Sequence, residues 1–152
     1  MIKVKPMTIE HIKKIHQIEE LSFPEDPWPL PAFEMELKNP NAIYMVACKN
    51  GVVLGYAGMH HIMDVAEIVN MAVSPSFRGQ KIGNQLMEGL LTRAFDLGVT
   101  TISLEVRQTN YNAIKLYQNH GFTAIATRYN YYKKPSENAI VMQKISRHGG
   151  KP

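Results

Sequence analysis

Residues 65–107 restrict the fold of this chain more than any other part of its sequence. Apolar residues dominate Val65–Val73 and alternate with polar ones over residues 100–107, which predicts two strands. Between them, apolar residues recur at the helical period until Gly98 ends it: Ile82, Leu86, Leu90, Ala94 and Leu97. A strand, a helix and a second strand in this order predict a right-handed crossover that joins two parallel neighbours.

The other predicted strands add antiparallel pairs on both sides of this unit. Alternating residues 2–5 predict a short first strand, and residues 42–48, the turn Asn50-Gly51 and Val52–Ile62 predict a hairpin. Residues 122–132 and 139–145 predict a last antiparallel pair. The fold class is therefore α/β (α+β), with a mixed, mostly antiparallel sheet of about seven strands and about four helices.

Three further helices are expected. Thr8 is a suitable N-cap for a helix that ends near Ser22, and its apolar residues recur every three positions: Ile9, Ile12, Ile15, Ile18 and Leu21. Pro31 is suited to the first turn of a second helix, which must stop before Pro40. Thr109 or Asn110 is expected to cap the last helix, which Gly121 ends.

The amino-acid composition limits the classes of protein to which this chain can belong. The chain has 152 residues, 45% of them hydrophobic and 20% charged, which is typical of one soluble domain, expected over residues 1–146 before a flexible tail at 147–152. The N-terminal residues lack the apolar run of an export signal, so we expect a cytoplasmic protein with no membrane partner. The single cysteine, Cys48, excludes an internal disulfide.

Charge and histidine spacing point away from two other classes of site. A net charge of +4 permits an anionic ligand, but solubility alone accounts for it, and no direct nucleic-acid binding is expected. His11 and His16 do not share a helical face, and His60 and His61 point to opposite sides of a strand. No metal site is therefore predicted.

Three features are candidates for ligand binding or catalysis, and each also has an ordinary structural explanation. The basic, glycine-containing residues 78–84 open a helix and suit a pyrophosphate, although such a segment is commonly only a connector. Glu105 shares a strand face with Ser103 and Arg107, either as a solvated partner of Arg107 or as a general base. Tyr117 is either a core residue with its hydroxyl at the rim or a proton donor to a thiolate.

These motifs together resemble those of the GNAT acetyltransferases. The similarity spans about residues 2–145 and rests on the order of elements, on Arg-Gly-Gln-Lys-Ile-Gly at 78–83, on Leu-Glu-Val-Arg at 104–107 and on Asn-Tyr-Asn-Ala-Ile-Lys-Leu-Tyr-Gln-Asn-His-Gly-Phe at 110–122. Within the family, the chain is most similar to the bacterial RimI-type ribosomal-protein alanine N-acetyltransferases. The resemblance implies the GNAT fold, in which the parallel pair is splayed in the middle of the sheet.

The resemblance also implies roles for particular residues. Glu105 matches the proton acceptor and Tyr117 the proton donor. The residues that match the acetyl-CoA contacts are Met71, Ala72, Val73, Arg78, Gly79, Gln80, Lys81, Ile82, Gly83, Asn84 and Asn110. Lys81 departs from the family motif, which usually has a glycine there. Residues that resemble the two borders of the substrate slot are Phe23, Trp28, Tyr131 and Tyr132, for which aromatic packing is the alternative.

The function that the resemblance implies is N-terminal acetylation. Acetyl-CoA is the expected cosubstrate, no metal is expected, and the expected partner is the N-terminus, with alanine first, of a small-subunit ribosomal protein. We expect direct attack in a ternary complex, by a monomer or weak dimer, because the sequence offers no covalent nucleophile. Two alternatives remain: a GNAT enzyme acting on a polyamine or aminoglycoside, for which Glu25 and Asp26 are candidate contacts, and a non-catalytic acetyl-CoA-binding module.

Overall fold

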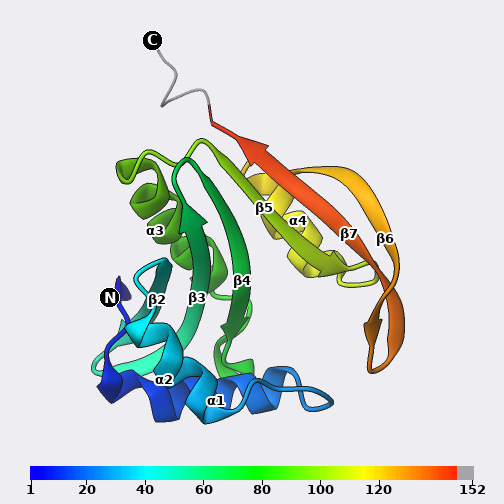
Figure 1. Ribbon diagram of the computed structural model, residues 1–152. Coiled ribbons are helices and arrows are strands. Elements are labelled where there is room, and N and C mark those ends of the chain that lie inside the picture. The colour runs from blue at the N-terminus through cyan, green and yellow to red at the C-terminus, as the bar shows by residue number, and fades with distance from the viewer. Residues whose placement is uncertain (147–152) are drawn as a thin grey trace.

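The computed structural model describes residues 1–146, which contain a seven-stranded sheet with helices on both faces (Figure 1). The strands are β1 (Lys3–Pro6), β2 (Ala42–Lys49), β3 (Val52–Ile62), β4 (Val65–Val73), β5 (Thr101–Arg107), β6 (Thr123–Lys133) and β7 (Ser136–Ile145). The helices are α1 (Ile12–Ser22), α2 (Leu30–Lys38), α3 (Ile82–Asp96) and α4 (Tyr111–Asn119), with short 3₁₀ turns at Ile9–His11 and Pro75–Phe77.

The strand order is β1-β2-β3-β4-β5-β7-β6, and β4 and β5 form the parallel pair among the described strands. Their ladder is short. It joins Val65 to Thr101, Ala66 to Ile102 and Glu67 to Ser103, after which both strands continue unpaired with each other. Figure 1 shows the two strands diverging from these paired ends. The predicted mixed sheet with a splayed parallel pair is confirmed.

A bulge in β4 determines which of its residues reach each face. Gly58 on β3 pairs with Asn70, but the next residue, Met59, pairs with Ile68, so Val69 is the extra residue. Before the bulge, Ile68 packs in the core under α3 and α4. After it, Ala72 packs in the second core, under α1 and α2. The side-chain alternation of β4 is therefore reversed halfway along the strand.

The stripe predicted for the first helix is only partly buried. Ile12, Ile15 and Ile18 are at most 2% exposed, whereas Ile9 is 64% and Leu21 65% exposed. A spacing of three residues turns by about 300° on an α-helix, so each step drifts by about 60° from the first. Residues two steps from Ile15 therefore leave the core face. Thr8 begins a 3₁₀ turn rather than the α-helix itself.

The other predicted elements agree with the structure to within a few residues at each end. The hairpin turn has positive φ at Asn50 (52°) and Gly51 (79°), the conformation that an Asn-Gly type I′ turn requires. Asn110, rather than Thr109, caps α4, and its side chain accepts a hydrogen bond from Ala113 N–H. The predicted tail at 147–152 lies outside the described residues. Within residues 1–146, no helix is both long and apolar enough to cross a membrane.

We expect Gly58→Ala to lower the free energy of unfolding by about 2–3 kcal/mol. A Cβ at Gly58 would overlap the ring of Tyr44. That ring has little freedom to move, because its hydroxyl donates to Glu36 at 2.9 Å and its edge packs against Phe33. Urea unfolding measures the change. Gly83→Ala, whose Cβ would lie an ordinary 3.4 Å from Leu116, is the matched control and is not expected to lose stability.

Candidate active site

The gap between β4 and β5 leaves backbone groups of β4 free. Ser74 N–H donates to Leu54 O at 2.7 Å, and antiparallel strands pair alternate residues through both backbone groups. Ala72 therefore bonds to β3, and the N–H groups of Met71 and Val73 point into the gap. The side chain of Ala72 is buried in the core under α1 and α2. The segment predicted to meet acetyl-CoA thus presents its backbone there.

The basic loop after β4 folds back over the end of that strand. Arg78 Nε donates to Val73 O at 3.2 Å, and Arg78 Nη2 donates to Ser22 Oγ, at the end of α1, at 3.1 Å. The next three residues, Gly79, Gln80 and Lys81, are exposed. The guanidinium of Arg78 therefore connects β4 to α1, while the exposed residues surround the start of α3.

The first turn of α3 provides unpaired amides. Gln85 N–H donates to Lys81 O at 3.2 Å, so the N–H groups of residues 82–84 have no partner inside the helix. The side chain of Ile82 is 1% exposed and belongs to the core. Asn84 Oδ1 lies 3.0 Å from His120 Nε2 and ties α3 to the end of α4. Ile82 and Asn84 therefore have their side chains engaged in the fold and offer only backbone N–H groups at the helix start.

Lys81 has φ 63° and ψ 21°, which is the left-handed conformation. A side chain costs about 1 kcal/mol in this region relative to glycine. We therefore expect Lys81→Gly to raise the free energy of unfolding by about 1 kcal/mol, as measured by urea unfolding. Lys81→Ala is the control, because it removes the ammonium but keeps the strained backbone. Equal stability of the two variants would contradict this explanation.

Glu105 lies on the open face of β5, as its alternation with buried neighbours predicted. Its Oε2 lies 2.9 Å from Arg128 Nε, and Tyr131 OH donates to its Oε1 at 3.4 Å. The pairing considered from sequence, with Arg107, is wrong. Arg107 Nη1 instead lies 3.2 Å from Glu137 Oε1. The strand register explains why the partners differ from those considered. Arg107 lies beside the first residues of β7, where it meets Glu137. Arg128 reaches Glu105 from β6.

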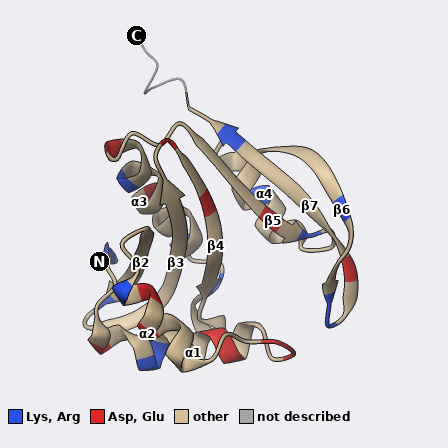
Figure 2. Cartoon of the chain, in the orientation of Figure 1, with Lys and Arg blue, Asp and Glu red and all other residues tan. Residues whose placement is uncertain are grey.

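Sequence reasoning missed Glu67, which stands beside Glu105. It occupies the last paired position of β4 before the splay, and Figure 2 shows acidic colour on both β4 and β5, on either side of the gap. Burial, followed by the charge of Glu105 and a hydrogen bond with it, raises the pKa of Glu67 above its usual value. The signal was present, since both glutamates occupy outward positions of adjacent strands, but only the register brings them together.

Tyr117 comes from the other side of the sheet, on α4. Its side chain is 9% exposed and packs edge-on against Phe122. Burial raises its pKa to about 12. Among residues 1–146, its hydroxyl has no hydrogen-bond partner. Burial, followed by the charge of Tyr131 and smaller contributions of Glu105 and Tyr117, raises the pKa of the nearby Tyr132 to about 12.

The four residues predicted to border the substrate slot differ in exposure and in packing. Tyr131 is 45% exposed and contacts Glu105, whereas the ring of Tyr132 lies under Arg107, whose Cζ is 4.2 Å from its centroid. Phe23 is 39% exposed at the end of α1. Trp28 packs against Phe33 with ring centroids 5.5 Å apart. Much of the Trp28 side chain is therefore used in aromatic packing, the alternative to a role at the substrate slot.

The loop that carries Trp28 is held by a buried carboxylate. Glu19 on α1 is 2% exposed, and its two oxygens accept hydrogen bonds from Trp28 N–H, at 2.9 Å, and from Tyr56 OH. A buried carboxylate needs such partners, because isolated charge is costly away from water. The proline-rich loop is thus fixed to α1 and β3 at the edge of the open face.

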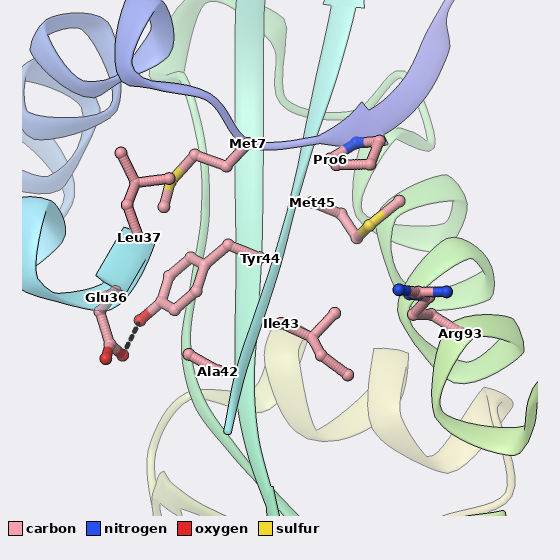
Figure 3. A pocket seen from close by; sticks show the side chains of 9 residues that line it. All are labelled: Pro6, Met7, Glu36, Leu37, Ala42, Ile43, Tyr44, Met45 and Arg93. Atoms are coloured by element: carbon pink, nitrogen blue, oxygen red, sulfur yellow. Dashed lines mark hydrogen bonds between the residues drawn. The ribbon is translucent and has the colours of Figure 1, made fainter. Parts of the chain in front are cut away.

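A pocket between β1, β2, α2 and α3 lies away from these groups. Figure 3 shows Glu36 and Arg93 on opposite sides of it, with Tyr44 OH bonded to Glu36. Its volume of about 190 Å³ is below the roughly 300 Å³ at which common small-molecule sites begin. Within residues 1–146, no three His, Cys, Asp or Glu side chains are grouped so as to hold a metal ion.

Comparison with known proteins agrees with this architecture. The acetyltransferase (GNAT) family model matches residues 12–122. A Bacillus subtilis (strain 168) protein assigned as a ribosomal protein bS18-alanine N-acetyltransferase is 37% identical over 140 residues, covering 91% of this chain and 92% of that protein. N-alpha-acetyltransferase RimI of Mycobacterium tuberculosis is 35% identical over 126 residues, covering 80% of this chain and 78% of that protein.

A solved structure extends the similarity to three dimensions. The crystal structure of the ribosomal-protein-S18-alanine N-acetyltransferase from Escherichia coli matches with a TM-score of 0.86 and 30% identity, over 96% of this chain and 95% of that one. The chain therefore belongs to the GNAT family of acetyltransferases. Its activity is that of an acetyl-CoA-dependent N-acetyltransferase, the class to which these relatives belong.

Proposed function

We propose that this enzyme acetylates the N-terminal amine of a ribosomal protein whose first residue is alanine, and that it does so in the cytoplasm as a monomer or weak dimer. The observation that carries the proposal is the splayed gap between β4 and β5, in a chain whose relatives are named for acetylating alanine of ribosomal protein bS18. In the proposal, Glu105 and Tyr117 act on either side of this gap. Acetyl-CoA supplies a thioester as the acetyl donor. The free amides of the gap fit an acyl carbonyl and its amide-containing arm.

In this proposal Glu105 accepts the proton of the incoming ammonium, and the neutral amine attacks. The N–H of Val73 donates to the carbonyl oxygen that becomes negative, and Tyr117 donates to the departing sulfur. A pKa of about 12 makes Tyr117 a weaker acid than a free tyrosine, near 10. The same apolar surroundings raise the pKa of a thiol beside it, so the donor and acceptor remain matched.

The remaining candidate residues have binding roles in the proposal. The amides of residues 82–84, with the exposed basic residues Arg78 and Lys81, would hold the pyrophosphate of acetyl-CoA. Asn110 caps α4 through Oδ1, which leaves its amide nitrogen for the cosubstrate. Phe23, Trp28 and Tyr131 would border the peptide on the open face of the sheet.

The energy of presenting a neutral amine favours an N-terminal substrate. At pH 7, deprotonating an α-amine of pKa near 7.8 costs about 1.1 kcal/mol, whereas a lysine amine near 10.4 costs about 4.6 kcal/mol. A carboxylate base can therefore deprotonate the α-amine without strong desolvation of that amine. This difference supports a protein N-terminus over a lysine side chain or a polyamine.

An acetylation assay with matched substrates tests the proposal. The enzyme and acetyl-CoA are incubated with an alanine-initiated ribosomal peptide, its pre-acetylated form, the same peptide beginning with proline, and a panel of polyamines and aminoglycosides. We expect one added acetyl mass on the free alanine peptide alone. Labelling of the small amines alone would assign the enzyme to that substrate class, and cofactor binding without any turnover would contradict catalysis.

A further inference from the structure

Arg107 is the last residue of β5, and its guanidinium holds the far end of the β6–β7 hairpin. Its Nη1 donates to Pro135 O at 2.9 Å, and its Nη2 donates to Lys134 O at 3.0 Å. The same Nη1 lies 3.2 Å from Glu137 Oε1. All three partners belong to the β6–β7 turn or to the start of β7, which Figure 1 shows beyond the end of β5. One side chain therefore joins β5 to this turn.

Two tyrosine rings connect this guanidinium to Glu105. Arg107 Cζ lies 4.2 Å from the centroid of the Tyr132 ring, an attractive contact between a cation and an aromatic face. The ring of Tyr132 meets that of Tyr131 edge-on, with centroids 5.1 Å apart. Tyr131 OH then donates to Glu105 Oε1 at 3.4 Å. A continuous series of contacts therefore leads from Arg107 back to Glu105, two residues earlier on the same strand.

A bulge in β6 makes Tyr131 dependent on such contacts. Three residues of β6, 129–131, oppose the single residue Asn138 of β7. Asn130 has a φ of 54°, and its N–H donates to the side chain of Asn138 at 2.9 Å. The extra residues of a bulge are left out of the regular ladder between the strands. The place of Tyr131 is therefore set by side chains, among them the ring of Tyr132.

We propose that Arg107 is a positioning residue of the substrate slot: its guanidinium holds the ring of Tyr132, which places Tyr131 where the peptide passes Glu105. The inference rests on the proposed function, because it takes Tyr131 as a border of the peptide and Glu105 as the proton acceptor. The contact with Tyr132 and the bonds to the two turn carbonyls do not involve Glu137, so loss of the Glu137 charge leaves them in place.

Arg107→Lys tests this role because it keeps the charge and removes the planar group. A guanidinium can lie on a ring while it donates to two carbonyls, whereas a lysine ammonium is a single point of donation. We expect the KM for the alanine-initiated peptide to rise roughly tenfold, with less than about a threefold change in kcat and in the KM for acetyl-CoA. Steady-state kinetics with each substrate varied in turn measures the three constants.

Arg93→Lys is the matched control, since Arg93 is an exposed arginine of α3. It should leave all three constants unchanged. An unchanged peptide KM in Arg107→Lys would overturn the inference. So would equal losses in kcat and in both KM values, which are the result expected if Arg107 only stabilises the fold.

A double-mutant cycle with Tyr132→Leu shows whether Arg107 acts through the ring of Tyr132. Tyr132→Leu removes the same contact from the other side, and it should raise the peptide KM to a similar extent, so the test does not depend on one variant folding. In the Tyr132→Leu background, Arg107→Lys should change the peptide KM by less than about twofold, because contacting residues are not additive. A further tenfold rise there would contradict the route through Tyr132.

Amide hydrogen exchange, followed by NMR, provides a readout that needs no substrate. We expect the Asn130 amide to exchange at least roughly tenfold faster in Arg107→Lys than in wild type, with unchanged rates in β2 and β3. Equal exchange of Asn130 in both proteins would overturn the inference. If wild type leaves the peptide unmodified, the proposed function is wrong, and exchange still decides whether Arg107 holds the hairpin. If wild type acetylates the peptide and the peptide KM of Arg107→Lys is unchanged, only the role of Arg107 is wrong.

Discussion

Glu105→Gln is expected to lower kcat/KM for the alanine-initiated peptide at pH 7 by about 10²- to 10⁴-fold, the range observed for loss of a general base. The substitution preserves the shape of the side chain and an oxygen that can accept from Arg128, which lies 2.9 Å away. It removes the negative charge of the side chain and, with it, the ability to take a proton. The difference in kcat/KM from wild type should narrow as the pH rises past about 8, because the peptide ammonium then loses its proton to water without a base.

Glu137→Gln is the matched control for this substitution. Glu137 also forms an ion pair with an arginine, Arg107, and it lies on the neighbouring strand β7. Its carboxylate accepts from Thr109 N–H and Oγ, and these bonds lower its pKa. We expect less than about a threefold change in kcat/KM, as for loss of a surface ion pair. Equal losses in the two variants would show that Glu105 acts through its ion pair and not as a base.

Tyr117→Phe is expected to reduce kcat by roughly 10²-fold or more, with little change in the KM for acetyl-CoA. The phenyl ring keeps the edge-on contact with Phe122, and the hydroxyl that is lost has no partner among residues 1–146. Stability should therefore be preserved. Steady-state kinetics with saturating peptide measures the effect. An unchanged kcat would exclude Tyr117 as the proton donor.

The matched control for Tyr117 is Tyr111→Phe, which removes a hydroxyl from the same helix at a side chain that is 72% exposed. It should leave kcat unchanged. The pKa of Tyr117, about 12, adds a pH expectation. A donor must be protonated, and Tyr117 stays protonated well below pH 12, so the wild-type kcat should not fall between about pH 8 and 10 on its account. A basic limb in that range would have to come from another group.

Much of the fold was predictable because its signals are local. The turn Asn50-Gly51 requires positive φ at both residues, and it joins β2 to β3 as predicted. Gly98 ends α3 with φ 85°, and alternation along β5 predicted which of its side chains are buried. Each of these features depends on the chain within a few residues, where backbone preferences and periodicity are strong.

Features that depend on two segments were not predictable in the same way. One of them is the bulge in β4, where the extra residue Val69 reverses the side-chain alternation of the strand because β3 pairs around that position. Similarly, Glu105 was considered a partner of Arg107, two residues away on the same face, but its partner in the structure is Arg128. Arg128 lies on β6, which β7 separates from β5, and its extended side chain can still reach the carboxylate. Such partners on other strands are not visible in the spacing along one strand.

The sequence by itself determined the order of strands and helices, the crossover that makes β4 and β5 parallel, and Glu105 and Tyr117 as candidates. These follow from side-chain period and from residues that stop or turn the backbone. The tertiary structure alone decided where β4 and β5 separate, and that Glu67 lies beside Glu105. Strand register sets such neighbours, and it results from packing of the whole sheet against its helices, which no local pattern encodes.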